Sequence, residues 1–485
     1  MDLHLSLTRS RNLAEDIFVQ MKQAILDGRL RAGDPLPSSR DLARQYAVGR
    51  NTVTRAYERL MAEGFLRGEV GAGTFVAADA AAVSRRAPRS SALRPRKIWA
   101  AFVGEAVERR SAEYDFRIGA PDPGLFPWDE WRGLVAHELR GRRSVPGYPG
   151  PEGDPRLREA IARHIGISRA VRAGGDDVLV CSGAQQAFDL IARVLVEPGA
   201  CVAVEDPGYP LFRHVLVSHG ARVVPVKVDA EGIDVAALPD DARLVYVTPS
   251  HQFPLGTRMS LGRRVALLRW CERRNAAIVE DDYDAEFRVE GQSVESLQSL
   301  DRAGRVLYVG TFSKVLLPTL RIGFVVAPAT LAPSLRAAKR LTDSHGPLEL
   351  QRALATLLTE GLFARHIRRL RRVYGARRDA LLTAVERVLA DVVTVLPSSA
   401  GLHVSVLCRD PGVDAAAWAT RAFREGVAVQ ALDAYYLTSP RPGFALGYGL
   451  IPVEKVADGI ARLAKAARPS RRVTNGAGVQ DRRLK

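Results

Sequence analysis

Hydrophobic and polar positions follow two different rhythms along this chain. In the first part, apolar residues recur roughly every three to four positions, which is the spacing of an amphipathic helix. The segment 12–30 is the clearest case, and Gly28 marks the expected end of its helix. The apolar positions of this segment are Leu13, Ile17, Val19, Met21, Ile25 and Leu26.

Two further helices and a small hairpin are predicted after this helix. Within 32–48, Ser38 or Ser39 can cap a short second helix, because either hydroxyl can accept from free N–H groups of the first turn. A tight turn then leads to a third helix over 48–65. The segment 66–77 predicts two short strands around a glycine-rich tip. This order of elements is typical of a winged helix-turn-helix.

The remainder of the chain alternates between strand-like and helix-like segments. Short apolar runs predict strands at 177–183, 201–207, 221–228, 243–250, 276–283, 305–311 and 321–328. Helices are predicted at 184–197 and 260–275. Such alternation predicts a mostly parallel sheet with helices on both faces. The fold class is therefore α/β in a multidomain chain, with the winged helix in front of a large α/β body.

We expect four parts along the chain. The winged helix covers 1–76, a flexible basic linker 77–111, the large body 112–467, and a basic, disordered tail 468–485. The linker prediction rests on a stretch rich in alanine, arginine and proline that has no periodicity at its start.

Net charge changes this picture through its location. The 485 residues carry a formal net charge of +16, which suggests nucleic acid as a partner. Residues 1–76 hold 11 basic and 9 acidic residues, so much of the excess lies in the linker and the tail. These arms could steer the protein toward DNA without recognising sequence, or could serve solubility alone. The arginine-rich segment 365–381 is better explained by a solvated or ion-paired helix than by a second DNA contact.

The sequence predicts a cytoplasmic protein with no membrane span and no metal site. No apolar run reaches spanning length, and the first residues lack the apolar core of a signal peptide. The cysteines are scattered, without the spacing of metal ligands, and are expected to be reduced: Cys181, Cys201, Cys271 and Cys408.

In the predicted winged helix, the third helix would supply the side chains that contact DNA bases. In a winged helix this helix enters the major groove by its N-terminal end. Arginine pairs with guanine, asparagine pairs with adenine, and threonine reaches phosphate or a thymine methyl. The candidates are Arg50, Asn51, Thr52, Thr54 and Arg55 on this helix, and Arg40 early in the second helix for the DNA backbone. The alternative is a three-helix bundle that binds protein.

The run from Leu13 to Val76 resembles the DNA-binding domain of the GntR family of bacterial regulators. The motifs that carry this resemblance are "G.L..GD.LPSSR.LA", "RNTV..AY..L..EG" and "G.GTFV". The resemblance implies binding to a double-stranded DNA operator.

One lysine of the body stands between two predicted strands. Lys314 follows the strand at 305–311 and precedes the strand at 321–328. A single lysine is usually solvated, but one held between buried strands is a candidate for a Schiff base with an aldehyde. A pyridine ring would need an anion at its nitrogen, which the acids ending 276–283 can supply. A phosphate would need a helix start and a cation, for which 181–190 and Arg321 are candidates.

The body, from about residue 115 to residue 463, resembles fold-type I aminotransferases, and the full chain resembles the MocR subfamily of GntR regulators. The motifs include "GYPGPEGDPRLREAIARHI", "VTPSHQFPLGTRMS", "VEDDYDAEFR" and "TFSKVLLPTLRIGF". The resemblance implies pyridoxal 5'-phosphate (PLP) as cofactor. Lys314 would form the internal aldimine, Asp281 or, as second choice, Asp282 would face the pyridine nitrogen, and Tyr283 would bind the ring hydroxyl. Around the phosphate it implies Ser182, Gly183, Ala184, Gln185, Thr311, Ser313 and Arg321.

The resemblance also implies a homodimer with shared sites. Tyr148 would reach the phosphate bound by the neighbouring subunit. Tyr209 and Phe253 are candidates to wall the cofactor ring, although both could equally be ordinary core aromatics. In related proteins the DNA-binding unit packs on the partner's body, so a head-to-tail dimer is expected.

Two departures separate this chain from working aminotransferases. Those enzymes usually carry an Asn-Pro turn where this chain has "TPSHQFPLG", a change that the MocR subfamily shares. They also hold the substrate carboxylate with a late arginine, and the matching position here is at or near Phe444. Arg441 is nearby, in a turn-prone stretch.

We therefore expect a PLP-dependent transcription regulator that senses a small amine, an amino acid or PLP itself. An incoming amine would displace Lys314 and favour one domain arrangement over another. The alternative is an active aminotransferase with a DNA-localising domain, and residual transamination fits either hypothesis. A regulator without cofactor ranks last, because Lys314, Asp281 and Arg321 are all present.

Overall fold

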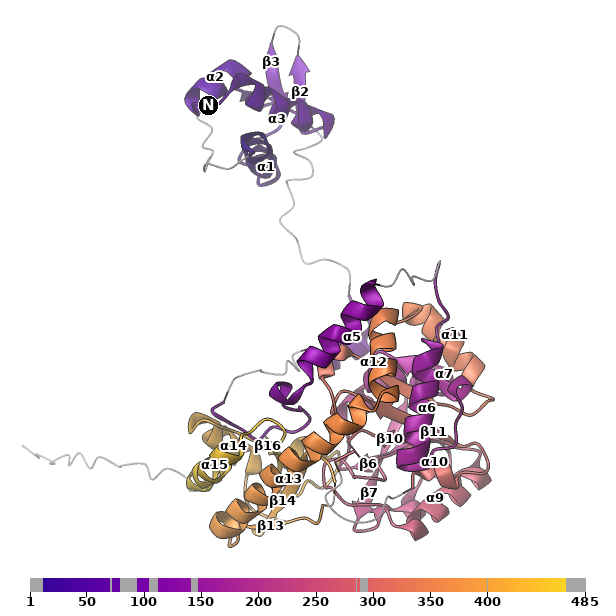
Figure 1. The fold of residues 1–485 in the computed structure, drawn as a ribbon. Helices are drawn as coiled ribbons and strands as arrows, with labels where there is room; N and C mark the ends of the chain where they lie inside the picture. Colours follow the sequence, from indigo (N-terminus) through magenta and orange to yellow (C-terminus); the bar gives the residue numbers. More distant parts are fainter. Residues whose placement is uncertain are drawn as a thin grey trace, which may run out of the picture. The chain divides into compact units, whose positions relative to one another are not determined.

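The computed structural model describes most of the chain, as two compact units (Figure 1). The described residues are 12–69, 72–78, 94–103, 112–140, 147–284, 286–287, 295–398 and 400–467. The units comprise Met1–Lys97 and Ile98–Lys485. The tail 468–485 and much of the linker 77–111 lie outside the described residues, so the finer division into four parts stays a prediction.

The smaller unit is a three-helix core with a small sheet. Its elements are α1 (Leu13–Leu26), β1 (Pro35–Leu36), α2 (Ser39–Gln45), α3 (Arg50–Ala62), β2 (Leu66–Glu69) and β3 (Gly73–Val76), with β3 between β1 and β2. Ser38 caps α2 by accepting from the Asp41 N–H. The prediction that Val19 belongs to the apolar face of α1 is wrong. Val19 is half exposed, and its neighbour Phe18 is buried in the core instead.

The larger unit is built on an eight-stranded sheet of order β5-β12-β11-β10-β9-β6-β7-β8. The strands are β5 (Val178–Cys181), β6 (Cys201–Asp206), β7 (Arg222–Asp229), β8 (Gly232–Ile233), β9 (Ala242–Val247), β10 (Ala277–Asp282), β11 (Val306–Thr311) and β12 (Gly323–Val326). From β11 to β7 all neighbours are parallel. Because β12 is antiparallel to both β11 and β5, β5 points the same way as β11. The prediction of a mostly parallel sheet is confirmed.

Helices cover both faces of this sheet, as the alternation predicted. They are α5 (Trp128–Arg140), α6 (Pro155–Arg169), α7 (Ala184–Leu195), α8 (Pro210–Ser218), α9 (Leu261–Arg274), α10 (Leu297–Leu300), α11 (Ala332–Asp343), α12 (Leu348–Thr359) and α13 (Leu362–Leu389). Successive residues of β11 enter different cores: Leu307 packs in the cluster that contains α7 and α8, and Tyr308 packs in the cluster that contains α6. Both faces are therefore buried, as expected for a parallel sheet.

A second, antiparallel sheet of order β13-β14-β17-β16 forms a C-terminal lobe with two helices (Figure 1). Its elements are β13 (Val393–Val395), β14 (His403–Cys408), α14 (Ala415–Arg424), β16 (Gln430–Ala431), β17 (Gly443–Gly447) and α15 (Val453–Lys465). β4 (Tyr114–Asp115) pairs with β15 (Val427–Ala428). Short 3-10 turns are η1 (Lys97–Phe102), η2 (Pro123–Leu125), η3 (Gly175–Asp177), η4 (Val235–Ala237), η5 (Pro318–Leu320) and η6 (Leu432–Tyr435).

The arginine-rich segment 365–381 lies within α13, and several of its side chains have partners in the same unit. Arg377 pairs with Asp122, Arg371 donates to the carbonyl of Glu286, and Arg378 donates to the carbonyl of Ser398. These contacts favour the interpretation of a helix whose charges serve the fold. None of the described helices is both long and apolar enough to cross a membrane.

Candidate cofactor site and DNA-binding helix

The predicted cofactor residues meet at one edge of the large sheet. The strands β5, β6, β9, β10 and β11 all end there, and ligands of open α/β sheets bind at this edge. A cavity of about 360 Å³ lies at the edge. The predicted residues that line it are Ala184, Gln185, Tyr209, Phe253, Asp281, Tyr283, Thr311, Ser313, Lys314 and Arg321. Residues from seven segments of the sequence thus come together around one space.

Strand geometry distinguishes the two aspartates at the end of β10. Neighbouring residues of a strand point to opposite faces of the sheet. Asp281 lines the cavity, whereas Asp282 accepts from Arg169 Nε at 2.7 Å and from Tyr308 Oη at 2.6 Å in the core. Asp282 therefore forms a buried ion pair with Arg169, on the side of the sheet away from the cavity. Asp281 fits the anion that a pyridine nitrogen would need.

Asp281 is held by one hydroxyl and keeps one oxygen without a partner. Tyr246 Oη donates to Asp281 Oδ2 at 2.7 Å, and Oδ1 is buried with no hydrogen-bond partner among the described residues. Burial raises the pKa of the Asp281 carboxyl to about 7, while the Tyr246 hydroxyl acts in the opposite direction. An N–H donor from the cavity would satisfy Oδ1 and stabilise the carboxylate.

Lys314 lies at the end of β11, with its amine in the same cavity. Lys314 Nζ donates to the carbonyl of Gly119 at 2.5 Å. Burial lowers the pKa of Lys314, and the charges of Asp284 and Asp281 oppose this effect. Burial therefore favours the neutral amine, which is the form that attacks an aldehyde.

The helix start at α7 forms a cradle for an anion. α7 has no side-chain cap, so its first N–H groups are available beside the cavity residues Ala184 and Gln185. Gly183 has a φ of +80°, and a Cβ there would lie 2.9 Å from Arg321 Nη1. Arg321 Nη2 donates to the Ser182 carbonyl at 2.5 Å. Ser182 and Gly183 therefore lie directly behind the cavity lining, where they position the arginine.

The hydroxyls and aromatic rings predicted for the site also lie there. Thr311 Oγ1 donates to Ser313 Oγ at 3.0 Å. The rings of Tyr209 and Phe253 meet edge to face, with centroids 5.4 Å apart, and both line the cavity. This placement favours a role as cavity walls over that of ordinary core aromatics.

Tyr148 is the predicted cofactor residue that lies apart from the cavity. Its side chain is 89% exposed, and its ring contacts that of His345, with centroids 6.2 Å apart. The role that the resemblance gave it concerns a neighbouring subunit. It stays a prediction.

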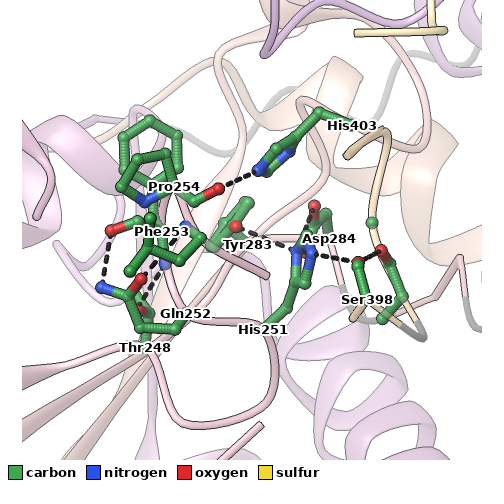
Figure 2. Close-up of polar contacts among 12 residues, drawn as sticks. Thr248, His251, Gln252, Phe253, Pro254, Tyr283, Asp284, Ser398 and His403 are labelled. Atoms are coloured by element: carbon green, nitrogen blue, oxygen red, sulfur yellow. Dashed lines mark hydrogen bonds and ion pairs between the residues drawn. The ribbon is translucent and has the colours of Figure 1, made fainter. Parts of the chain in front are cut away.

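Sequence reasoning missed several residues of the site. Tyr246 was hidden inside an ordinary apolar strand, where only the register of β9 beside β10 places it next to Asp281. His251, Asp284 and His403 form a buried polar cluster (Figure 2), and Asp284 and His403 also line the cavity. The polar residues in "TPSHQFPLG" and "EDDYD" were the available signals, since both stretches follow strands of this edge.

The late carboxylate ligand of aminotransferases has no counterpart among the described cavity residues. Phe444 is buried in the core of the C-terminal lobe and packs edge to face on Trp418, which excludes a role as ligand. Arg441 is exposed and does not line the cavity.

The predicted DNA-contact residues lie at the start of α3 and on α2. Arg40, Arg50, Asn51 and Arg55 are exposed, and Thr52 and Thr54 are half-buried. Thr54 Oγ1 donates to the Arg50 carbonyl at 3.1 Å, within the helix. Among the described residues, Arg40, Arg50 and Arg55 form no ion pair, whereas Arg44, Arg59 and Arg67 each pair with an acidic side chain. The arginines without an ion pair among the described residues of this unit thus include the three that the winged-helix geometry assigns to DNA, and Arg31 is another.

Comparison with known proteins matches both units. Residues 13–76 match the model of the bacterial regulatory proteins of the gntR family, and residues 115–445 match that of aminotransferase class I and II. The computed model is similar to the crystal structure of kynurenine aminotransferase from Pyrococcus horikoshii, with a TM-score of 0.69 and 28% identity. The match covers 79% of this chain and 96% of that one. The fold and site thus define a winged helix joined to an aminotransferase-like body of a class that depends on PLP.

Two relatives match this whole arrangement. The chain is 37% identical over 463 residues to the probable rhizopine catabolism regulatory protein MocR of Rhizobium meliloti, covering 93% of this chain and 92% of that protein. It is 37% identical over 462 residues to the transcriptional regulator TauR of Rhodobacter capsulatus, covering 92% and 94%. The chain belongs to the MocR subfamily of GntR-family transcription regulators.

Tyr246 and Tyr308 offer a matched test of the two aspartates. Each donates to one buried carboxylate, so Tyr246→Phe and Tyr308→Phe should both lower the free energy of unfolding by about 1–3 kcal/mol. Tyr246→Phe should also weaken PLP binding roughly tenfold, because it favours protonated Asp281. Tyr308→Phe should leave PLP affinity unchanged. PLP titration and thermal unfolding measure both effects, and equal losses of affinity would contradict the assignment of Asp281.

Proposed function

We propose that this protein is a PLP-binding repressor or activator whose DNA binding responds to a small amine. The observation that carries the proposal is the juxtaposition, in one cavity, of Lys314, the unpartnered Oδ1 of Asp281 and the uncapped start of α7. These three groups are complementary to the aldehyde, the ring nitrogen and the phosphate of PLP. The cofactor, when bound, supplies a carbonyl that reacts reversibly with amines.

The residues of this chain then have separate tasks. Lys314 Nζ would supply the amine that holds the cofactor, and its position in the cavity would allow an incoming amine to compete with it. Asp281 would accept from the ring nitrogen, and Tyr283 would contact the ring hydroxyl. Thr311, Ser313, Gln185 and Arg321 would hold the phosphate, with Ser182, Gly183 and Ala184 as the backbone cradle, and Tyr209 and Phe253 would flank the ring.

The effector is proposed as a small primary amine, with or without a carboxylate. Arg441 does not line the cavity, so the lining itself offers no late arginine for an α-carboxylate. The apolar side chains Leu211 and Leu402 in the lining leave room for a largely apolar or neutral body on the amine. PLP itself remains a candidate signal, because its own binding fills the same space.

The DNA-binding part of the proposal rests on α3 and α2. Arg50 and Asn51 in the first turn of α3 would contact base edges, with Thr52, Thr54 and Arg55 beside them, and Arg40 would contact phosphate. The ligand can alter DNA affinity only by binding two arrangements of the units differently. A head-to-tail homodimer would couple ligand binding in the larger unit to DNA binding by the smaller unit. The exposed ring of Tyr148 is available to reach a partner's phosphate site.

The competing function, an active aminotransferase with a localising domain, is less well supported. The relatives that match along nearly the whole chain are named as regulators. Steady turnover of two substrates, with PLP regenerated in each cycle, would favour the enzyme.

Lys314→Arg tests the covalent part of the proposal while keeping the positive charge. Borohydride reduction of the PLP-loaded wild type should attach the cofactor to the peptide that contains Lys314, as read by mass spectrometry. The variant should show no attachment, and its DNA affinity should no longer respond to amines. Lys227→Arg, an exposed lysine of β7, is the control and should behave as wild type. Attachment elsewhere in the wild type would contradict the proposal.

Arg50→Ala and Arg59→Ala test the DNA-binding end of α3. Each removes one positive charge from the same helix, but Arg59 pairs with Glu15 and Glu63 whereas Arg50 forms no ion pair with a described residue. On sites that the wild type selects from random DNA, Arg50→Ala should cost about 1–3 kcal/mol of binding free energy. Arg59→Ala should cost much less, once its folding is checked. Equal losses would point to charge alone, without base recognition.

A further inference from the structure

The polar cluster around His251, beside the cavity, joins three segments of the larger unit (Figure 2). His251 follows β9, Tyr283 and Asp284 follow β10, and Ser398 precedes β14 in the C-terminal lobe. His251 Nδ1 lies 3.1 Å from each oxygen of Asp284 and 3.0 Å from Tyr283 Oη. His251 Nε2 lies 3.1 Å from Ser398 Oγ. The cluster therefore links the large sheet to the lobe through one imidazole ring.

This histidine and its acid are buried and closely packed. His251 is 2% exposed and Asp284 is 3% exposed. Gly401 has a φ of +87°, and a Cβ there would lie 2.2 Å from His251 Cε1 and 2.5 Å from Asp284 Oδ2. A buried pair of this kind costs desolvation energy that an apolar pair would not. Its member Asp284 and the neighbouring Tyr283 both line the cavity, which suggests what the pair is for.

The hydrogen positions follow from the partners. A carboxylate can only accept, so the Nδ1 that faces Asp284 carries the hydrogen. Because Nδ1 carries this hydrogen, it cannot accept from the Tyr283 hydroxyl. The Tyr283 oxygen instead accepts from the same N–H that Asp284 accepts from. The hydrogen of the Tyr283 hydroxyl is thereby left for a group in the cavity.

We propose that His251 and Asp284 form a positioning pair that fixes the Tyr283 hydroxyl as a hydrogen-bond donor toward the cavity. The inference rests on the PLP binding proposed above. It adds a role for His251 and Asp284, which would act on the cofactor through Tyr283. Asp284 orients His251, His251 orients Tyr283, and Tyr283 donates to the ring oxygen of PLP. Other titratable groups around this chain of contacts are Asp281, Asp282, Glu205, His403, Lys314 and Tyr448.

A metal ion is the competing occupant of this cluster. His251, Asp284 and His403 offer ligand atoms that lie within 4.8 Å of one another. However, His403 Nε2 already donates to the Pro254 carbonyl at 2.9 Å, and His251 Nδ1 has two partners. The observed contacts satisfy the polar atoms without an ion, which favours the positioning pair.

Two amide variants of His251 test the pair in the full-length protein loaded with PLP. Asparagine places its N–H near the position of Nδ1, whereas glutamine places it near Nε2. A donor to the ring oxygen favours the form in which this oxygen carries full negative charge, so losing it moves the pH titration of the bound cofactor's visible spectrum upward. We expect His251→Gln to move the midpoint up by about one to two pH units, as Tyr283→Phe should. His251→Asn should remain close to wild type.

Control variants distinguish the loss of these contacts from a general disturbance of the fold. His219→Gln alters another His–Asp pair of the same unit, in which Nε2 lies 2.8 Å from Asp189, and should leave the midpoint unchanged. The double variant His251→Gln with Tyr283→Phe should shift no further than Tyr283→Phe alone, because both changes remove one interaction. A chelator should have no effect on any of these midpoints.

Several outcomes would overturn the pair. The positioning pair would be refuted if the spectral midpoint of His251→Gln equalled that of the wild type, or if the two shifts added in the double variant. Either result would leave the proposed PLP binding intact. A chelator-induced shift that zinc reverses would replace it with a metal site. If the wild type shows no saturable spectral change with PLP, the proposed function itself fails, and the pair fails with it.

Discussion

The burial of one carboxylate, Asp281, is the constraint on which the candidate site depends. A carboxylate at the end of a buried strand, with a single hydroxyl donor, is unstable in its charged form, and the pKa of about 7 expresses this. A cation or an N–H donor in the adjoining cavity would relieve the instability. Every other proposed contact is arranged around the group that would supply that donor.

The parallel sheet makes this arrangement possible. Because β5, β9, β10 and β11 end at one edge, groups that are far apart in the sequence face one space without long loops. Strand alternation then divides the charges: Asp281 turns to the cavity, and Asp282 turns to Arg169 in the core. The same edge approaches the C-terminal lobe through His251 and Ser398, so changes in the cavity have a polar route to a second sheet.

Much of the fold and part of the site could be predicted from the sequence. Short apolar runs placed each strand of the large sheet that was predicted, and the acids, the lysine and the helix start were recognisable from their residue types. The contacts of Tyr246, His251 and Asp284 could not be predicted, because they depend on which strands become neighbours and on a loop of the C-terminal lobe more than a hundred residues away. Val19 is a different case, in which the spacing itself was misjudged: on a helix Val19 lies nearly opposite Ile17, whereas Phe18 lies on the side of Met21 and Ile25 and is buried with them.

The most direct test of the central claim is the protonation state of the cofactor's ring nitrogen. Protein loaded with PLP that carries ¹⁵N in its ring can be observed by NMR at neutral pH, for the wild type and for Asp281→Asn. The account predicts a protonated nitrogen in the wild type and an unprotonated one in the variant, because an ionised Asp281 stabilises the N–H. An unprotonated nitrogen in the wild type, or a signal that the substitution leaves unchanged, would contradict it.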